Sequence, residues 1–544
     1  MRTRPPPPAT APRSPTPWPR PPSPPTTTPP PAPPASAWPS SAAAARSPPP
    51  APCPAGSRPS WRRPSAAIPS SPPRPSSSSR PRPFPPPKPP TTSTSCWRPS
   101  APDRPGRPRA HPRTPVPLAV RPRDHARPSH HPVDGGELRL IGFDPRGVGR
   151  STPVTCGLEP EEENWLRPYK EATFDKDVAW AHDVARKCRE KSGATLKHIT
   201  TRNTARDMDL LRAVLGEKKV SYFGYSYGTY LGAVYTQMFP GRADRFVLDS
   251  AVDPARAWRG MIQWWAEGAE PAFDRWTEWA AARSERYGLG DTPKKVDRTF
   301  WDLVQRADEK PIEMDGEKYT GDDVRGMMRG AVFSVKEGTE LVVELKKAAA
   351  GEPASAKRLP APAGTTRPAA DADVPSDNGT AGFWTVVCND NSAAWSRDPE
   401  SYRRDAIEDK GRYPLFGDFA SSVKPCAFWD RSAEPATVVN NEVGSLVVQN
   451  EWDSQTPLPS GQALHADLKG SKILTVLGGE GHGVYPSGNA CADGGVEDYL
   501  TTGKLPAKDV TCEATAGSNG DARENRKRDV LPGAPLPQRS PDRF

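Results

Sequence analysis

The feature that most limits what this chain can fold into is a serine placed between a short apolar strand and a helix. The run Gly-Tyr-Ser-Tyr-Gly (224–228) follows the apolar residues Val220–Phe223 and precedes a helical pattern that continues to about Met238. Small residues on both sides let the backbone turn sharply and expose the serine side chain at the tip of the turn. A serine hydroxyl becomes an effective nucleophile when it is positioned in this way and paired with a base. We therefore expect Ser226 to be a catalytic nucleophile.

An acid and a base follow the serine, each after an apolar run that predicts a strand. Asp453 follows Ser445–Gln449, and His482 lies in a glycine-rich segment after Ile473–Leu477. Because the carboxyl ends of parallel strands meet at one edge of a sheet, we expect these two side chains to gather there with Ser226. His482 would then accept the serine proton and later protonate the leaving group, while Asp453 fixes the histidine tautomer.

Two other residues compete for these roles. Asp249 also ends a predicted strand, Arg245–Leu248, but it follows directly on the helix after the serine and is interpreted as structural. Asp453 is therefore the expected acid. His465 is the only other histidine after the serine, and surface exposure on a helical stretch accounts for it.

When the serine attacks a carbonyl group, the carbonyl oxygen becomes negatively charged (the oxyanion). Two backbone donors are expected to stabilise it, and only one can be assigned from the sequence. The backbone N–H of Tyr227 is the expected first donor, and the second should come from a glycine-rich loop after an earlier strand. No such loop occurs upstream of residue 138. Because the loss of one donor costs on the order of a hundred- to a thousandfold in rate, a catalytically impaired copy of an enzyme is an alternative interpretation.

The order of apolar runs predicts the fold class. From about residue 138, apolar runs alternate with helical patterns, as in a mostly parallel sheet flanked by helices. The first predicted strand is Leu138–Phe143. Residues 255–350 carry no strand signals and have tryptophans at helical spacing, which indicates a helical insertion over the sheet. The Ala/Pro/Gly-rich residues 350–375 predict a loop.

The first 133 residues have a different composition from the rest. They hold 46 of the 72 prolines, 20 basic residues and only two acidic ones. Such a segment buries too little apolar surface to offset the entropy of ordering it, so we expect disorder. The remaining residues are net acidic, with 54 basic and 63 acidic side chains. The positive net charge of the whole chain, +9, is therefore due to the leader.

Two origins of this leader remain open. It is either a natural extension or coding sequence read in the wrong frame, because Pro, Arg, Ser and Ala are what GC-rich DNA yields out of frame. A basic arm that binds polyanions would make this a non-catalytic binding protein, but interleaved aromatics are missing and no specific nucleic-acid partner is expected. No stretch is long and apolar enough for a transmembrane segment, and residues 1–30 lack the apolar core of a signal peptide.

Six cysteines outside the leader fall into three pairs that are close in sequence. No pair has a metal-binding spacing, so no metal is expected. The pairs are interpreted as three local disulfides, which indicate an oxidising, extracellular location, with buried free thiols as the alternative. They are Cys156 with Cys188, Cys388 with Cys426, and Cys491 with Cys512.

Several motifs in one order resemble the tripeptidyl aminopeptidases secreted by actinomycetes. The resemblance covers roughly residues 138–515. Its motifs are Ile-Gly-Phe-Asp-Pro-Arg-Gly-Val-Gly-Arg-Ser-Thr-Pro (141–153), Gly-Tyr-Ser-Tyr-Gly-Thr-Tyr-Leu-Gly (224–232), Val-Leu-Asp-Ser-Ala-Val-Asp-Pro (247–254), Gln-Asn-Glu-Trp-Asp-Ser-Gln-Thr-Pro (449–457), Gly-His-Gly (481–483), Cys491, and a Tyr-Leu-x-x-Gly-x-Leu-Pro stretch ending near Cys512.

The resemblance implies an α/β-hydrolase fold with a helical cap, secretion, and removal of di- or tripeptides from free N-termini through an acyl-enzyme. It also maps Ser226, Asp453 and His482 onto the family triad. The partners would be peptides with a free N-terminus, acted on by a monomer without cofactors. An esterase, or another hydrolase with the same triad, is the nearest alternative because the fold does not fix the substrate.

A carboxylate is the natural partner of a substrate's α-ammonium group. Cys388-Asn389-Asp390 resembles a Cys-x-Asp element of the family, so Asp390 is the first candidate and Glu451 the second. A solvated loop carboxylate is the alternative for Asp390.

These patterns divide the chain into five parts. The leader is 1–134, the first part of the hydrolase core with the nucleophile is 135–254, and the cap with its loop is 255–375. The second part of the core, with acid and histidine, is 376–515. The polar tail is 516–544.

Overall fold

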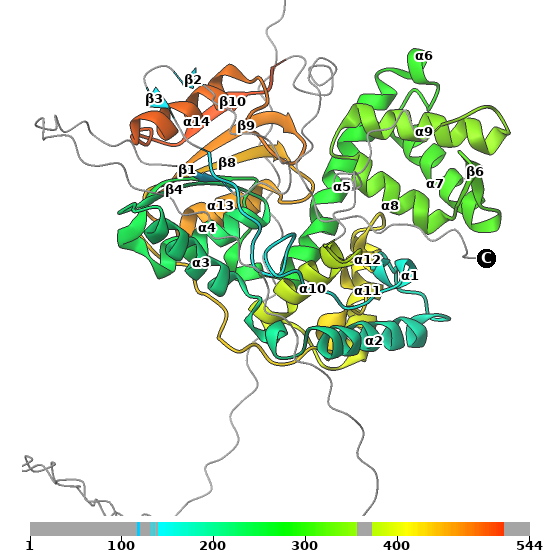
Figure 1. The fold of residues 1–544 in the computed structure, drawn as a ribbon. Coiled ribbons are helices and arrows are strands. Elements are labelled where there is room, and N and C mark those ends of the chain that lie inside the picture. The colour runs from blue at the N-terminus through cyan, green and yellow to red at the C-terminus, as the bar shows by residue number, and fades with distance from the viewer. Residues whose placement is uncertain (1–116, 120–131, 134–135, 138–139, 356–372, 516–544) are drawn as a thin grey trace, which may run out of the picture. The chain divides into compact units, whose positions relative to one another are not determined.

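The fold is known from a computed structural model that describes residues 117–119, 132–133, 136–137, 140–355 and 373–515 (Figure 1). Most of the leader, most of the predicted loop 350–375 and the tail beyond 515 lie outside the described residues. Expectations about those segments therefore remain predictions.

Among the described residues, a parallel sheet of six strands carries the fold. Its order is β1-β4-β5-β8-β9-β10, and every neighbouring pair is parallel. Parallel neighbours need long crossover connections, which here contain helices. The predicted strands before Ser226, Asp453 and His482 are confirmed. The strands are β1 (Pro117–Ala119), β4 (Val220–Tyr225), β5 (Ala243–Asp249), β8 (Ser445–Trp452), β9 (Lys472–Glu480) and β10 (Val510–Glu513).

Both faces of the sheet are covered by helices. Successive residues of a strand point to opposite faces. Tyr222 and Phe246 therefore pack on the side of α4 (Tyr227–Met238) and α13 (Leu458–Asp467). Phe223 and Val247 pack on the opposite side, with α14 (Ala490–Thr502). Figure 1 shows α14 across the sheet from α4 and α13. This burial on both sides explains why the strands read as continuous apolar runs.

A helical insertion separates β5 from β8. We call its first part, α5 to α9, the cap. Its helix α5 begins among residues of the sheet's core and ends in a second apolar core that belongs to the cap. The cap elements are α5 (Arg259–Ala281), α6 (Ser284–Tyr287), α7 (Pro293–Glu309), β6 (Ile312–Met314), β7 (Glu317–Tyr319), α8 (Gly321–Ala331) and α9 (Val335–Ala350).

The expectation that residues 255–350 contain no strand is wrong. The strands β6 and β7 form an antiparallel hairpin around Asp315-Gly316. Both turn residues have a positive φ, 56° and 83°. Asp-Gly is a favoured pair for such two-residue turns, so this dipeptide was the signal in the sequence.

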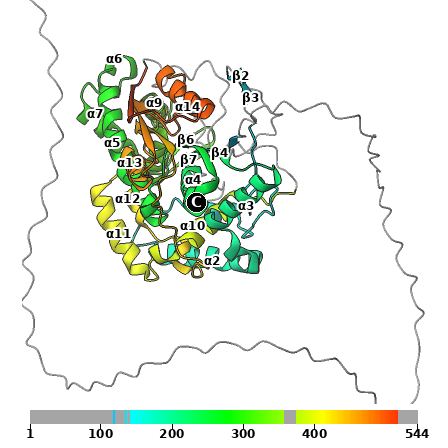
Figure 2. The same cartoon turned by 90° about the vertical axis from the view of Figure 1, so that its left-hand side faces the viewer.

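The remaining helices pack around the sheet's core rather than in the cap. In Figure 2, α2, α3 and α10 lie away from α6 and α7. Residues 378–428, assigned from sequence to the second part of the core, are thus helical. These elements are α1 (Pro160–Glu163), α2 (Phe174–Ser192), η1 (Gly193–His198), α3 (Thr201–Val214), η2 (Pro240–Arg242), η3 (Pro254–Arg256), α10 (Asn378–Asp390), η5 (Ser392–Ala394), α11 (Pro399–Arg412), α12 (Gly417–Ser421) and η6 (Pro425–Phe428).

The predicted strand Leu138–Phe143 does not form as expected. Ile141 makes a single bridge, Gly142 and Phe143 belong to no strand, and residues 138–139 lie outside the described part. A strand requires a neighbour for its ladder hydrogen bonds. In the described sheet, the edge beside β4 is taken by β1. A second short pair is formed by β2 (Pro132–Val133) and β3 (Gly136–Glu137).

Within the described residues, three disulfides join the six cysteines outside the leader, in the pairs Cys156–Cys188, Cys388–Cys426 and Cys491–Cys512. Each closes a loop of fewer than 40 residues, with sequence separations of 32, 38 and 21. Cross-links of this kind restrict the unfolded chain and are typical of proteins outside the reducing cytosol. Among the described helices, none combines the length and apolar character needed to cross a bilayer.

Candidate active site

Ser226 lies in a sharp turn between β4 and α4. Its backbone has φ 51° and ψ −120°, a strained conformation for a residue with a side chain. The turn is held from behind because the Ser226 N–H donates to the carbonyl of Asp249 (3.0 Å), at the end of the neighbouring strand. The predicted strand-turn-helix around Ser226 is therefore present.

Two glycines allow the turn to sit this close to the sheet. A Cβ on Gly224 would lie 2.6 Å from the ring of Tyr222 and 2.7 Å from the carbonyl oxygen of Gly228. A Cβ on Gly232, one turn into α4, would lie 2.7 Å from Leu248. Larger residues at these positions would push α4 away from β4 and displace the serine.

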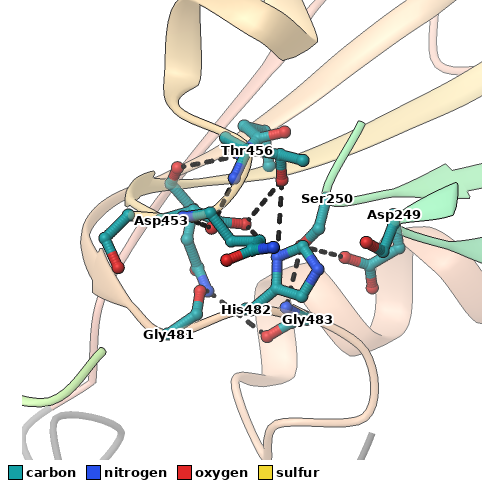
Figure 3. Close-up of polar contacts among 12 residues, drawn as sticks. Asp249, Ser250, Asp453, Thr456, Gly481, His482 and Gly483 are labelled. Atoms are coloured by element: carbon teal, nitrogen blue, oxygen red, sulfur yellow. Dashed lines mark hydrogen bonds and ion pairs between the residues drawn. The ribbon is translucent and has the colours of Figure 1, made fainter. Parts of the chain in front are cut away.

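His482 and Asp453 are in direct contact. The Nδ1 of His482 lies 2.8 Å from Oδ2 of Asp453 (Figure 3). The Asp453 side chain is fully buried and that of His482 is 9% exposed. The other carboxylate oxygen, Oδ1, accepts the backbone N–H groups of Gln455 (2.8 Å) and Thr456 (3.0 Å). Burial by itself raises the pKa of the Asp453 carboxyl, but His482 and these donors bring that pKa below its usual value. The carboxylate is thus held ionised beside the imidazole.

The opposite nitrogen of the imidazole is left free. In the described part of the chain, Nε2 of His482 is buried and has no hydrogen-bond partner. Because Nδ1 donates to Asp453, Nε2 carries the lone pair that a general base requires. No hydrogen bond joins Ser226 to His482 among the described residues. Such contacts are often loose in ligand-free enzymes.

The loop that carries His482, residues 481–485, is fixed from both sides. On one side, the amide nitrogen of Asn450 donates to the carbonyls of Glu480 (3.1 Å), Gly481 (3.0 Å) and Gly483 (3.3 Å). On the other side, Ser250 and Asp249 accept three consecutive backbone N–H groups, those of residues 483, 484 and 485, at 2.8 to 3.1 Å. Figure 3 shows the imidazole between Asp453 and the Asp249–Ser250 pair.

Asp249 therefore lies behind the histidine instead of binding its ring. Its backbone carbonyl holds the N–H of Ser226, and its carboxylate holds the loop of His482. Burial raises the pKa of the Asp249 carboxyl to about 7, against the opposing effect of the donors from Tyr485 and Val484. This geometry fits a structural role for Asp249, and no sequence pattern around Asp249 predicts its contacts with both segments.

We expect Asp249→Asn to lower kcat/KM about 10- to 100-fold, because asparagine offers one acceptor for two N–H donors and the displaced histidine loses alignment. In the wild type, a raised carboxyl pKa means that the folded state binds the extra proton between about pH 4 and 7. This group's contribution to stability therefore falls as pH rises through that range and is constant above it. Denaturant unfolding at a series of pH values measures this slope, which the variant should lack.

The control is Asp244→Asn, at the opposite end of the same strand, where the carboxylate accepts from Ser221 (3.2 Å). That variant should keep the pH slope of the wild type. An unchanged slope and rate in Asp249→Asn would contradict the role assigned to Asp249.

Tyr227 opens helix α4, where first-turn N–H groups have no partner within the helix. Its ring hydroxyl lies 3.0 Å from Oγ1 of Thr201.

Asp390 accepts from the N–H (2.7 Å) and Oγ1 (2.5 Å) of Thr201 and from Nε1 of Trp258 (2.9 Å). Burial raises the Asp390 pKa to about 6. A buried carboxylate with three donors is not the solvated loop group that we weighed for Asp390.

The other candidate from the sequence, Glu451, is partly exposed near the end of β8, and its Oε2 accepts the N–H of Gly478 (2.7 Å). His465 is also only partly exposed and contacts Oγ of Ser471 (2.6 Å), away from Asp453 and His482.

Sequence reasoning missed a group of cap residues that contact the loops carrying Asp453 and His482. Arg329 of α8 is buried and donates to the side chain of Gln455 and, at 3.5 Å, to the carbonyl of Ser454. Burial lowers the Arg329 pKa to about 10. The Phe333 ring lies 6.2 Å from the His482 imidazole. A buried arginine in a helix has no signal in one sequence, because the same pattern fits an exposed one.

The second donor for the oxyanion is not identified. Residues 120–131, which follow β1 beside the serine strand, lie outside the described part of the chain. Within the described ranges, no cluster of three or more His, Cys, Asp or Glu side chains is arranged to hold a metal ion.

Comparison with known proteins identifies relatives along most of the chain. Residues 129–301 match the sequence model described as alpha/beta hydrolase fold, and residues 413–512 match the one described as TAP-like protein. The chain is 34% identical to the tripeptidyl aminopeptidase of Streptomyces lividans over 394 residues, which cover 69% of this chain and 70% of that protein. The serine protease Hip1 of Mycobacterium tuberculosis is 27% identical over 399 residues, covering 69% and 74% respectively.

Proposed function

The chain belongs to the tripeptidyl aminopeptidase family of α/β hydrolases, and from this premise we propose that it is a serine exopeptidase that releases short peptides from free N-termini. The observation that carries the proposal is the contact of 2.8 Å between His482 Nδ1 and Asp453 Oδ2, which leaves Nε2 without a partner in the described chain. Ser226, in its strained turn, is the nucleophile that this base serves.

In the first half of the reaction, Oγ of Ser226 attacks the carbonyl carbon of the scissile amide while Nε2 of His482 takes the hydroxyl proton. The imidazolium that forms is stabilised by the ionised Asp453. The negative charge moves to the carbonyl oxygen, where the N–H of Tyr227 donates to it. Collapse of this intermediate breaks the C–N bond, and His482 gives its proton to the departing amine.

In the second half, a water molecule attacks the ester that joins the short peptide to Ser226. His482 accepts a proton from the water and returns one to the serine oxygen as the C–O bond breaks. The released peptide has two or three residues and a new carboxylate. The same residues act in both halves, so no cofactor takes part in the proposed steps.

The disulfides support a proposal about the place of action. In the described part of the chain, three cross-links favour an oxidising compartment, and we propose that the enzyme works outside the cell.

The test is cleavage of two matched substrates by the purified full chain. One is a tripeptide p-nitroanilide with a free amino group, and the other is its N-acetylated form. We expect kcat/KM to be about 10- to 100-fold higher for the free form, because a charged hydrogen bond to the α-ammonium group is lost on acetylation. Release of p-nitroaniline is followed by absorbance.

Equal cleavage of the two anilides, together with rapid hydrolysis of a p-nitrophenyl ester, would make the chain a broad esterase or amidase with the same triad. No hydrolysis of either class would support the interpretation as an impaired copy that lacks an oxyanion donor.

A further inference from the structure

Glu480 is the last residue of β9 and joins the histidine strand to the cap. Its side chain is 3% exposed. Its Oε2 accepts from a guanidinium N–H of Arg275 in α5 (2.5 Å) and from the backbone N–H of Val335, the first residue of α9 (3.3 Å). Both donors belong to the cap.

The second carboxylate oxygen of Glu480 has no such partner. In the described chain, Oε1 is closed to solvent and makes no hydrogen bond. An unsatisfied buried acceptor is costly and uncommon in folded proteins, so it calls for an explanation. An oxygen that receives a donor only when substrate is bound provides one.

The position of Glu480 suits the end of a short peptide. It precedes His482 by two residues, so the two Cα atoms are at most about 7 Å apart. A peptide of two or three residues in extended form spans about 7 to 10 Å. Phe333 faces the His482 ring and is two residues from Val335, which contacts Glu480. The same cap segment therefore borders both side chains.

We propose that Oε1 of Glu480 binds the α-ammonium group of the substrate, and that the distance from Glu480 to the catalytic pair limits the released product to two or three residues. This inference rests on the proposed exopeptidase activity. The ammonium ion supplies the missing donor, and the hydrogen bond from Arg275 to Oε2 holds the carboxylate in its orientation.

The two carboxylates predicted from sequence fit this role less well. Asp390 already accepts three hydrogen bonds from Thr201 and Trp258. Glu451 is partly exposed, so water solvates its carboxylate when no substrate is bound. Binding of an ammonium group to Glu451 therefore contributes less free energy.

The experiment compares Ala-Ala-Ala-p-nitroanilide with propionyl-Ala-Ala-p-nitroanilide, which differs only by replacement of the ammonium group with hydrogen. The readout is the ratio of kcat/KM for the two substrates within one enzyme preparation, which does not depend on the folded fraction. We expect the ratio of the wild type to fall about 10- to 100-fold in Glu480→Gln, mainly through a higher KM for the amino-free substrate. Hydrolysis of p-nitrophenyl butyrate, which has no ammonium group, is measured in the same preparations.

The matched control is Asp418→Asn. Asp418 is buried and forms an ion pair with Arg325 of α8, so it also ties the cap to another part of the chain. It has no contact with β9 among the described hydrogen bonds. We expect this variant to lose stability and keep the substrate ratio of the wild type.

The outcomes separate the inference from the proposed function. If the wild type hydrolyses neither the anilides nor the butyrate in a Ser226-dependent way, the proposed function fails. If the wild type prefers the amino-free substrate and Glu480→Gln retains that preference, only the inference is overturned. If the ratio falls in Glu451→Gln instead, Glu451 is the residue that binds the ammonium group. Equal loss on all substrates in Glu480→Gln reduces Glu480 to a structural link between cap and strand.

Discussion

Replacing Ser226 with alanine should lower kcat for an amino-free tripeptide anilide by about a million-fold, which is the scale seen when a serine nucleophile is removed from a triad. The reason is that no covalent intermediate can form, so His482 and Asp453 have no hydroxyl to activate. The change removes one oxygen from a turn whose backbone bond to Asp249 is unaffected. We therefore expect normal folding, which circular dichroism and denaturant unfolding would show.

Ser221→Ala is the appropriate control. Ser221 lies on the same strand and is buried, but its hydroxyl contacts Asp244 (3.2 Å) at the other end of the sheet. This variant should keep its rate and be labelled by a fluorophosphonate, whereas Ser226→Ala should not be labelled. Labelling of Ser226→Ala would show that another residue is the nucleophile.

Asp453→Asn should lower kcat by about ten-thousandfold while leaving the fold intact. The asparagine carbonyl can keep the backbone donors of Gln455 and Thr456, which turns its NH2 group toward Nδ1 of His482. The imidazole must then accept at Nδ1 and carry its proton on Nε2, which makes it useless as a base. Single-turnover acylation with an activated ester measures this loss directly.

The comparison that decides between the two acids is Asp249→Asn. We expect a loss of at most about 100-fold there, since Asp249 acts on the loop and not on the ring. A larger loss in Asp249→Asn than in Asp453→Asn would contradict the assignment of the acid.

The elements that carry the site could be predicted from sequence because each has a strong local signature. The apolar runs before Ser226, Asp453 and His482 are buried on both faces of a parallel sheet, which removes polar residues from them. Glycine is required at positions 224 and 232 because a Cβ there would lie only 2.6 to 2.7 Å from neighbouring atoms. Local packing and backbone geometry thus leave a clear trace in the sequence.

The residues that hold the site in place could not be predicted from the sequence. Asn450 holds three carbonyls of the histidine loop, but a polar residue at the end of a strand also fits a solvated position. Glu480 and Arg275 are separated by 205 residues, so their pairing depends on how the cap folds over the strands. The strand expected at Leu138–Phe143 does not form as predicted for the same reason. The hydrogen bonds of a strand depend on a partner strand that is distant in sequence.

The placement of the cap within the chain has a consequence during synthesis on the ribosome. The strand β5 ends at Asp249, and its neighbour β8 begins only at Ser445. At translation rates of about 5 to 20 residues per second, roughly 200 residues take about 10 to 40 s to appear. For that time the edge of β5 has no partner, while the cap, with its own apolar core, has all of its residues available to fold. The nascent chain would thus expose an unpaired strand edge beside the insertion until the second half of its sheet is synthesised.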